Sequence, residues 1–492
     1  MDALDAIVTP QSAWRVEHAD KLTVIVDAHA YFIAAKEAMI EARQSVLLIG
    51  WDFDTRLPLE PTGATVEGPN ALGEFLKWLP ERRKGLHVHL LKWDLGVFEG
   101  LERGMLPIFI TDLLTKKDLT LKLDAAHPVG AAHHSKIVVI DDSIAFCGGI
   151  DMTAHRWDTP AHDDEDPARV ALNGEPTQPW HDVTTAVTGD VARALGDLAR
   201  ERWRLATGDI IPPPDPREPI WPPSIKTTLT DTHVAIARTY PDYNGHPEVR
   251  EVEALYLNGI AAAKHTLYIE SQYLASETLT DALAARLGEE DGPEIVLVLP
   301  RTSEGWLRQK AMDGARRERL AQLWEADVHG RFAAFYPVTE GGLPIYVHAK
   351  VMVVDDRAMR VGSSNLNNRS MGFDTECDLM VDAGVCADED GRARIRQAVL
   401  SVRDDLVGEH LWVKREELSE AISVNGGSLL RAIEALMGDG RTLRRFTPDL
   451  VDDEDSIIAD NALADPDAAE PLSIRLKDGT VALVEQIAER LR

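Results

Sequence analysis

Hydrophobic residues along the chain alternate between helical spacing and short unbroken runs. Residues 31–44 carry apolar side chains at helical spacing, and the apolar run 45–53 that follows predicts a buried strand. The same order returns over 252–274, and a second apolar run follows in each half, at 86–93 and 294–301. Strands that alternate with amphipathic helices predict an α/β fold with mostly parallel sheets covered by helices on both faces.

A repeated motif indicates that the chain is a doubled unit. The sequence HSKIVVID at 134–141 is matched by HAKVMVVD at 348–355. The two histidines lie 214 residues apart, and so do Gly148 and Gly362. A shared offset of this kind indicates an internal repeat of two units of about 200 residues each. If the units pack about a pseudo-twofold axis, equivalent residues meet where the two lobes face each other.

Composition along the chain predicts the domain boundaries. A Pro-rich segment at 211–223 reads as a stiff, extended linker. It separates an N-terminal lobe, 1–210, from a C-terminal lobe, 224–440. Residues 441–492 form an acidic C-terminal extension, in which 449–470 contain nine Asp or Glu and no Lys or Arg. We expect a solvated segment there.

Charge and cysteine usage narrow the function classes. The chain has 492 residues, of which 82 are acidic and 52 basic, and the formal net charge is −30. Such a surface repels nucleic-acid phosphates, so we expect no nucleic-acid partner. The three cysteines include no CxxC pair and favour a reducing compartment. The start of the chain lacks signal-peptide character, and no run reaches the 18 or more apolar residues of a spanning helix, so we expect a cytoplasmic protein.

The repeated motif can build a phosphate site. Residues i and i+2 of a strand point to the same face, so His134 projects with Lys136, and His348 projects with Lys350. Two such pairs that converge on one pocket form a compact cationic site. One neutral imidazole can attack phosphorus, and the other can protonate the departing alkoxide and later deprotonate water. The lysines would hold the phosphate oxygens, and neither a metal nor a cofactor is required.

Carboxylates complete the candidate catalytic set. Asp182 and Glu376 each begin an apolar run after one of the motifs, and each can hold the second ring nitrogen of a histidine. Asp141 and Asp355 end the motif strands and join the candidates as motif members, although aspartate at a strand end more often fixes the following turn.

Structural roles compete with these interpretations. A single HxK in a strand is usually an edge or surface pair, but two copies in one register are hard to attribute to packing. Cys147 and Cys377 suit small core positions better than nucleophiles, since neither has an evident activating base. For Trp51, a core position and a ligand contact are equally good interpretations.

These motifs resemble the phospholipase D superfamily, defined by two HxKx4D motifs. Accessory segments resemble its true phospholipase D branch: GGID at 148–151, RWD at 156–158, PWHDV at 179–183, YIESQY at 268–273, GSSN at 362–365, NRS at 368–370 and EHL at 409–411. The resemblance covers most of residues 30–415. It implies two similar α/β/α sandwich lobes with the active site at their interface.

By this resemblance His134 is the nucleophile and His348 the general acid, although the residues themselves leave the reverse assignment open. Asp182 and Glu376 would orient the histidines. Lys136 and Lys350 would bind the phosphate oxygens, and the candidate substrate-binding residues are Asn365, Ser363, Gly149, Asp151, Trp51 and Gln272. Asp151 stands where the second half has Asn365, and an anion there would repel phosphate.

The family's reaction is hydrolysis of a phospholipid to phosphatidic acid and the head-group alcohol, with transphosphatidylation when an alcohol replaces water. The resemblance thus implies a phospholipid substrate and transient contact with a membrane surface. Because nothing before residue 30 resembles the lipid-binding modules of plant or animal members, we expect no calcium or phosphoinositide requirement. A monomer suffices, because the repeat supplies both halves of the site. The alternatives are a cardiolipin synthase-like phosphatidyltransferase, a nuclease, which the net charge disfavours, and a non-catalytic lipid-binding module, which would usually carry a broken motif.

Overall fold

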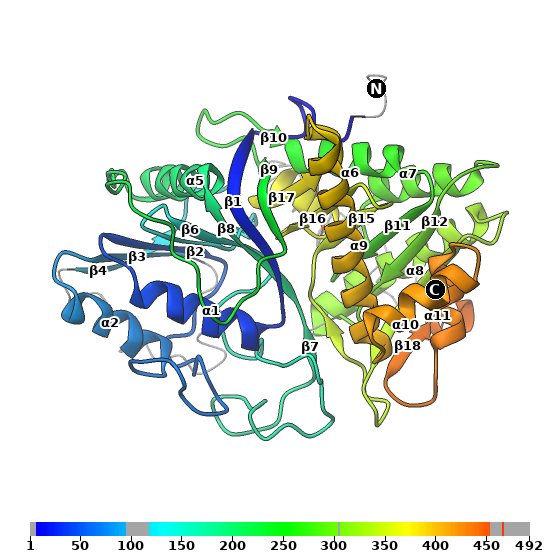
Figure 1. Cartoon of the computed structure of the whole chain (residues 1–492), viewed down its shortest axis with the longest axis horizontal. Helices are drawn as coiled ribbons and strands as arrows, with labels where there is room; N and C mark the ends of the chain where they lie inside the picture. Colours follow the sequence, from blue (N-terminus) through cyan, green and yellow to red (C-terminus); the bar gives the residue numbers. More distant parts are fainter. Residues whose placement is uncertain (1–5, 95–117, 304–305, 453–464, 467–492) are drawn as a thin grey trace, which may run out of the picture.

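The computed structural model describes residues 6–94, 118–303, 306–452 and 465–466. In this part of the chain, two α/β lobes share one 16-stranded sheet (Figure 1). The first lobe contributes β1 (Arg15–Val26), β2 (Ser45–Gly50), β3 (His87–Trp93), β4 (Leu119–Asp124), β5 (Ile137–Ile140), β6 (Ile144–Gly148) and β8 (Val183–Gly189). The second contributes β9 (Leu229–Tyr240), β10 (Val249–Arg250), β11 (Thr266–Glu270), β12 (Glu294–Val298), β13 (Phe332–Val338), β15 (Val351–Val354), β16 (Ala358–Gly362), β17 (Glu376–Asp382) and β18 (Thr442–Arg445).

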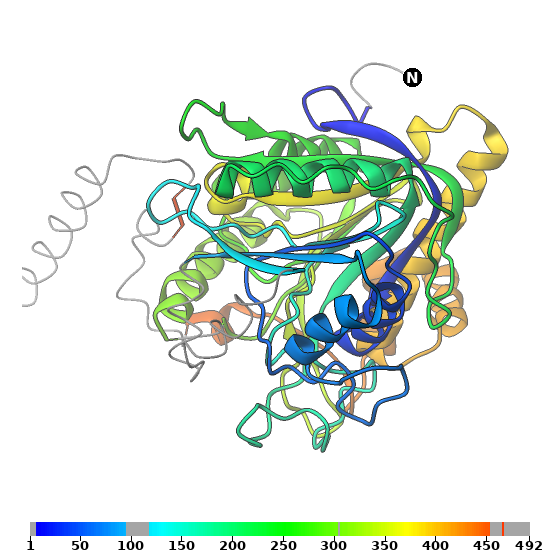
Figure 2. The same ribbon diagram turned by 90° about the vertical axis from the view of Figure 1, so that its left-hand side faces the viewer.

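Helices cover both faces of the sheet in each lobe (Figures 1 and 2). The first lobe has α1 (Ala28–Ile40), α2 (Leu72–Arg82) and α5 (Asp190–Thr207). The second has α6 (Glu251–Ala262), α7 (Glu277–Gly288), α8 (Trp306–Ala326), α9 (Glu389–Leu411), α10 (Arg415–Val424), α11 (Leu429–Leu436) and α12 (Pro448–Asp452), with a π-helical turn at Arg369–Phe373 and a 3-10 turn at Ala383–Val385. Alternate residues of β2 enter opposite cores: Leu48 packs with α1 and α2, and Leu47 packs with α5. The predicted layered architecture is therefore confirmed.

Strand pairing is mixed. The order across the sheet is β18-β13-β12-β11-β15-β16-β17-β9-β1-β8-β6-β5-β2-β3-β4, with β10 beside β9. Parallel pairs join β2 to β3 and β3 to β4, and likewise β11 to β12 and β12 to β13. The motif strands β5 and β15 instead form antiparallel hairpins with β6 and β16. The prediction of parallel pairing is thus confirmed for β2–β3–β4 and β11–β12–β13. It is corrected for the motif strands, because a tight turn joins each hairpin and no crossover helix is needed. The central strands β8, β1, β9 and β17 also pair antiparallel.

The domain boundaries need one correction. The linker 211–223 contains neither helix nor strand, as predicted. The second lobe, however, continues past residue 440, because β18 pairs with β13 and α12 follows it. Asp465 in the acidic extension is buried rather than solvated, and its carboxylate accepts hydrogen bonds from the backbone N–H groups of Asn368 and Arg369 at 2.9 and 2.8 Å. The remainder of 453–492 lies outside the described residues.

The lobes also meet through short parallel contacts beside the motifs. In a separate two-stranded sheet, β7 (Trp180–His181) pairs with β14 (Tyr346–Val347), directly before His348. At the equivalent place before the first motif, His133 forms a bridge with Thr375. These contacts bring both HxK segments to the lobe interface. Among the helices described, none combines the length and the apolar character that crossing a membrane requires.

Candidate active site

Both motif histidines line one cavity of about 260 Å³ between the lobes. Each lies just before a buried strand, β5 or β15, whose unbroken apolar sequence anchors it in the sheet. The backbone N–H of His134 donates to the carbonyl of Thr375 at 2.9 Å, and that of His348 donates to the carbonyl of His181 at 2.8 Å. The two motif histidines therefore meet at one cavity, as predicted from the repeat.

Each histidine is held by a carboxylate from the opposite lobe. The Nδ1 atom of His134 lies 3.1 Å from both carboxylate oxygens of Glu376. The Nδ1 atom of His348 lies 2.6 Å from Oδ2 of Asp182. Because a carboxylate accepts a hydrogen bond, Nδ1 carries the proton in both rings and Nε2 keeps the lone pair. The structure thus joins both predicted carboxylates to the histidines, but across the lobes.

The carboxylates have their own supports, and two predicted substrate-binding residues belong to these. The Ser363 hydroxyl donates to Glu376, and the Ser370 hydroxyl donates to the same carboxylate at 2.7 Å. A Cβ atom on Gly149 would collide with Oδ1 of Asp182. Neither Ser363 nor Gly149 lines the cavity. Their predicted contact with substrate is therefore corrected: Ser363 positions Glu376, and Gly149 leaves space for Asp182.

Burial and nearby cations keep both imidazoles neutral. Burial lowers the pKa of His134 well below its ordinary value, and the charges of Lys136 and Lys350 lower it further. The pKa of His348 is also well below its ordinary value, first through burial and then through the charges of Lys350 and Arg156. A bound phosphate anion would offset these cations and favour protonation of one ring. The free site accordingly presents two neutral imidazoles.

The lysines have different partners in the two halves. The ammonium of Lys136 lies 3.1 Å from the carboxylate of Asp151, which also accepts a hydrogen bond from the backbone N–H of Trp51 at 3.1 Å. The ammonium of Lys350 donates to the side-chain oxygen of Gln272 at 3.4 Å. Burial lowers the pKa of Lys350 to about 7. Asp151 therefore compensates Lys136 at close range, whereas the side chain that contacts Lys350 is a neutral amide and the carboxylates of Asp182 and Glu376 act on it through their charge.

The other predicted substrate-binding residues lie on the cavity wall. Trp51, Asp151, Gln272 and Asn365 all line it. The Asn365 side-chain oxygen is buried and has no hydrogen-bond partner among the described residues. Trp51 stacks on Trp93, with ring centroids 5.9 Å apart, so it serves as packing and cavity wall together.

Asp141 and Asp355 do not belong to the cavity, which corrects their candidate catalytic role. The Asp141 carboxylate accepts hydrogen bonds from the backbone N–H groups of residues 43–45 at 2.6–2.8 Å. Asp355 does the same for residues 264–266 at 2.8–2.9 Å. Both residues have a positive φ, 50° and 53°, which suits a turn. They tie the start of β2 and β11 to the far ends of the motif strands.

Arg156 is a cavity residue that sequence reasoning did not select. Its guanidinium carbon lies 4.1 Å from the ring centroid of Trp180, which stacks in turn on Tyr346 at 4.5 Å. The RWD and PWHDV segments were noticed for their resemblance to the family. Their contact could not be predicted from spacing, because a long loop separates them.

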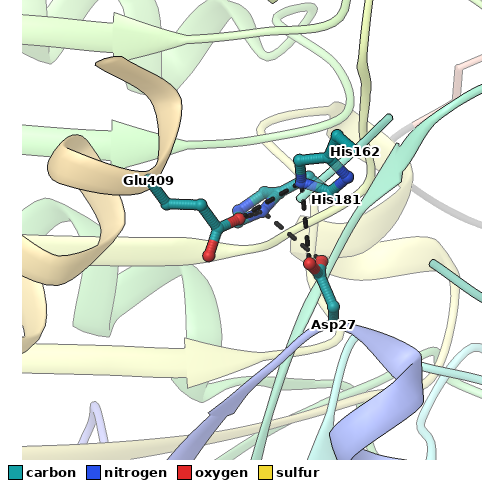
Figure 3. Close-up of side chains that lie close together, drawn as sticks. All are labelled: Asp27, His162, His181 and Glu409. Carbon is teal, nitrogen blue, oxygen red and sulfur yellow. Dashed lines mark hydrogen bonds and ion pairs between the residues drawn. The ribbon is translucent and has the colours of Figure 1, made fainter. Parts of the chain in front are cut away.

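A buried cluster beside this site could hold a divalent cation (Figure 3). Ligand atoms of Asp27, His162, His181 and Glu409 all lie within 4.8 Å of one another. Oε1 of Glu409 is 2.8 Å from His181 Nδ1 and 3.2 Å from His162 Nε2. Burial and the charge of Glu409 raise the pKa of Asp27 to about 8. Sequence reasoning missed this cluster, because its members are spread from the end of β1 to α9 with no motif spacing.

Comparisons with known proteins agree with this geometry. The family model described as "Phospholipase D" matches residues 38–212, and the model described as "Cardiolipin synthase, PLD-like domain" matches 256–389. The two matches fall on the two lobes. Each covers one motif, as an internal repeat requires.

Curated relatives include both kinds of enzyme. Phospholipase D alpha 1 of Cynara cardunculus is 24% identical over 485 residues, which cover 70% of this chain and 59% of that protein. Cardiolipin synthase A of Cronobacter sakazakii (strain ATCC BAA-894) is 26% identical over 337 residues, covering 68% and 62%. The chain thus spans about three fifths of the length of these relatives.

A solved structure shares the fold. The crystal structure of phosphatidylserine synthase from Haemophilus influenzae Rd KW20 aligns with a TM-score of 0.53 and 12% identity, covering 85% of this chain and 96% of that one. At this identity the likeness concerns the fold alone.

The HxKx4D motif occurs twice in the chain, and the histidines of both copies meet at the lobe interface. Together with the two family matches, this shows that the chain belongs to the phospholipase D superfamily.

Proposed function

We propose that the protein is a phospholipase D that hydrolyses phospholipids to phosphatidic acid and the head-group alcohol through a phosphohistidine. One observation carries the proposal: two imidazoles, each held at Nδ1 by a carboxylate, face one cavity between the lobes. This arrangement supplies a nucleophile and an acid on opposite sides of a bound phosphorus atom, as an in-line displacement needs.

In the first step, Nε2 of one histidine attacks phosphorus. A P–N bond forms, the P–O bond to the head group breaks, and the other histidine, protonated once the phosphate is bound, donates its proton to the departing alkoxide. Lys136, Lys350 and Asn365 stabilise the non-bridging oxygens. In the second step that same histidine takes a proton from water, the water oxygen attacks phosphorus, and the P–N bond breaks. Phosphatidic acid leaves, and both rings return to their starting states.

We assign His134 as the nucleophile and His348 as the acid, following the family resemblance. Radiolabelled phospholipid, mixed with enzyme and quenched within a turnover, tests this assignment. His348→Ala should still accumulate label on the protein from a substrate with a good leaving group, because such a group needs no acid. His134→Ala should not. The opposite result would reverse the two roles.

A phosphatidyltransferase of the cardiolipin synthase kind is the second candidate. It is favoured by the family match over residues 256–389 and by the cardiolipin synthase relatives. Both reactions share the phosphoenzyme and differ in whether water or a lipid hydroxyl accepts the phosphatidyl group.

Product analysis separates the two reactions. The purified chain is incubated with vesicles of phosphatidylcholine, phosphatidylethanolamine or phosphatidylglycerol, with and without a primary alcohol, and the lipids are separated and quantified. A phospholipase D releases phosphatidic acid from at least one of these lipids and forms the phosphatidyl alcohol when alcohol is present. Dominant cardiolipin formation from phosphatidylglycerol would establish the transferase instead. The double variant with both motif histidines replaced by alanine is the control.

A further inference from the structure

The two halves of the chain differ at equivalent positions of the cavity wall. The 214-residue offset that relates the motifs also relates Asp151 to Asn365 and Arg156 to Ser370. Both Arg156 and Ser370 line the cavity. Ser370 supports Glu376 through its hydroxyl, as described above. The first half instead places a guanidinium at this position, where the second half has a neutral hydroxyl.

Aromatic stacking holds the Arg156 side chain at the cavity. Arg156 is 5% exposed, and its guanidinium lies on the face of Trp180, which is 1% exposed. Trp180 also contacts Tyr346 and His348, whose ring centroids are 4.5 and 5.3 Å away. Stacking engages the face of a guanidinium, whereas its N–H groups lie in the plane and match the spacing of phosphate oxygens.

The charge of Arg156 affects the pKa values of His348 and of its partner Asp182. Burial is the main cause that lowers the pKa of His348, and Arg156 lowers it further together with Lys350, Lys136 and His134. Burial raises the pKa of Asp182 to about 6, and the charge of Arg156 opposes that rise. On the other side of the cavity, His134 is influenced by the carboxylates Asp374 and Asp151, which raise its pKa in opposition to burial and the lysines. Arg156 therefore adds positive charge on the side of the cavity where Asp182 holds His348.

We propose that Arg156 is a further catalytic residue, whose guanidinium binds a non-bridging oxygen of the phosphodiester beside His348. This inference rests on the proposed phosphodiesterase function. The ligand class is an oxyanion of a phosphodiester, and the contact strengthens as charge builds on the oxygens in the transition state. Arg156 also couples binding to proton transfer. Without a ligand its charge adds to burial and to Lys350 in keeping His348 neutral, and when the phosphate neutralises the guanidinium, His348 can more readily take up the proton that the leaving group needs.

The test compares Arg156→Gln and Arg156→Lys with Arg193→Gln, a control that removes an exposed guanidinium from α5. Activity is measured on phospholipid vesicles and on the soluble diester bis(4-nitrophenyl) phosphate. Arg156→Gln should lower kcat/KM by about 10²–10³-fold on both substrates, because the phosphate is their shared part. Arg156→Lys, which keeps the charge without the planar fork, should lose less. The alkaline limb of the kcat/KM profile, which reports the general acid, should move to higher pH in Arg156→Gln, since the pKa of His348 rises.

Sulfate binding measured by calorimetry keeps the test independent of activity. Wild-type protein and the Arg193→Gln control should bind sulfate alike, and Arg156→Gln should bind it at least about tenfold more weakly. Equal sulfate affinity and an unchanged pH profile in Arg156→Gln would show that Arg156 only packs on Trp180, and would overturn the inference. If the wild type cleaves no diester, the proposed function fails, while the sulfate comparison still decides the ligand of Arg156. Arg156→Lys serves the same comparison if the Gln variant does not fold.

Discussion

The imidazole of His134, in the first lobe, is held at Nδ1 by the carboxylate of Glu376, in the second lobe, at 3.1 Å from each oxygen. The reciprocal pair, His348 with Asp182, crosses the interface in the other direction. Each half-site is therefore completed by the other lobe. The relative placement of the lobes determines the catalytic geometry as directly as either motif does.

Replacing Glu376 with glutamine should show whether this side chain orients the ring of His134 or only packs beside it. The amide keeps the size of the side chain, but it can donate to Nδ1 and so favour the wrong tautomer of His134. We expect kcat to fall by about 10²–10⁴-fold while the protein stays folded. Steady-state kinetics with a thermal unfolding curve on the same preparation checks this. An unchanged kcat would mean that Glu376 plays no part in orienting the histidine.

The two histidines should behave as one functional unit. His134→Ala removes one partner of the relay and His348→Ala the other, so each variant alone should reduce turnover nearly as much as the double variant. The measurement is kcat for all three on one phospholipid. Substantial residual activity in either single variant would rule out the two-histidine mechanism.

The repeated aspartates should affect stability rather than chemistry. The carboxylate of Asp355 accepts three backbone hydrogen bonds. Its replacement by alanine removes these hydrogen bonds, two of which are exposed to water, and should lower the free energy of unfolding by about 1–2 kcal/mol, with kcat of the folded enzyme unchanged. Denaturant titration measures the first effect and kinetics the second. Asp356→Ala, at the neighbouring half-exposed residue, is the control. A large fall in kcat in a folded Asp355→Ala enzyme would return this residue to the catalytic set.

Close packing around Asp182 gives a further expectation. The absent side chain of Gly149 leaves space for Oδ1 of Asp182. Gly149→Ala should push this carboxylate away from His348 and lower kcat by about 10²-fold, because small displacements of a positioned group are costly to catalysis. Gly288→Ala, where a Cβ atom meets nothing within 4 Å, is the matched control. Equal kcat in both variants would contradict the positioning role of Gly149.

Much of this architecture could be predicted from local sequence. The apolar runs of β2, β5, β11 and β15 are continuous, and the common offset showed that the HxK pairs were equivalent. It could not be predicted that each carboxylate holds the histidine of the opposite lobe, since distance along the chain does not say which lobe a side chain faces. The cluster that includes Asp27 and Glu409 was hidden for the same reason. Its members come together only when β1 and α9 pack at the interface.

Anion binding should depend on the protonation of Lys350. Burial lowers its pKa to about 7, far below the ordinary value of 10.5, so the folded protein loses this charge as pH rises through about 7. Because the unfolded chain holds that proton to a much higher pH, stability should rise between pH 7 and 10 while anion affinity falls. Sulfate is a suitable probe, since its own charge is constant over this range.

We expect the dissociation constant of sulfate to increase by up to about tenfold per pH unit above pH 7 in the wild type, as binding comes to require uptake of one proton. Lys350→Met should bind sulfate weakly and with little pH dependence over the same range. Calorimetric titrations from pH 6 to pH 9 give both curves. A flat wild-type curve, or a Lys350→Met curve with the same slope, would show that another group controls the charge of the cavity.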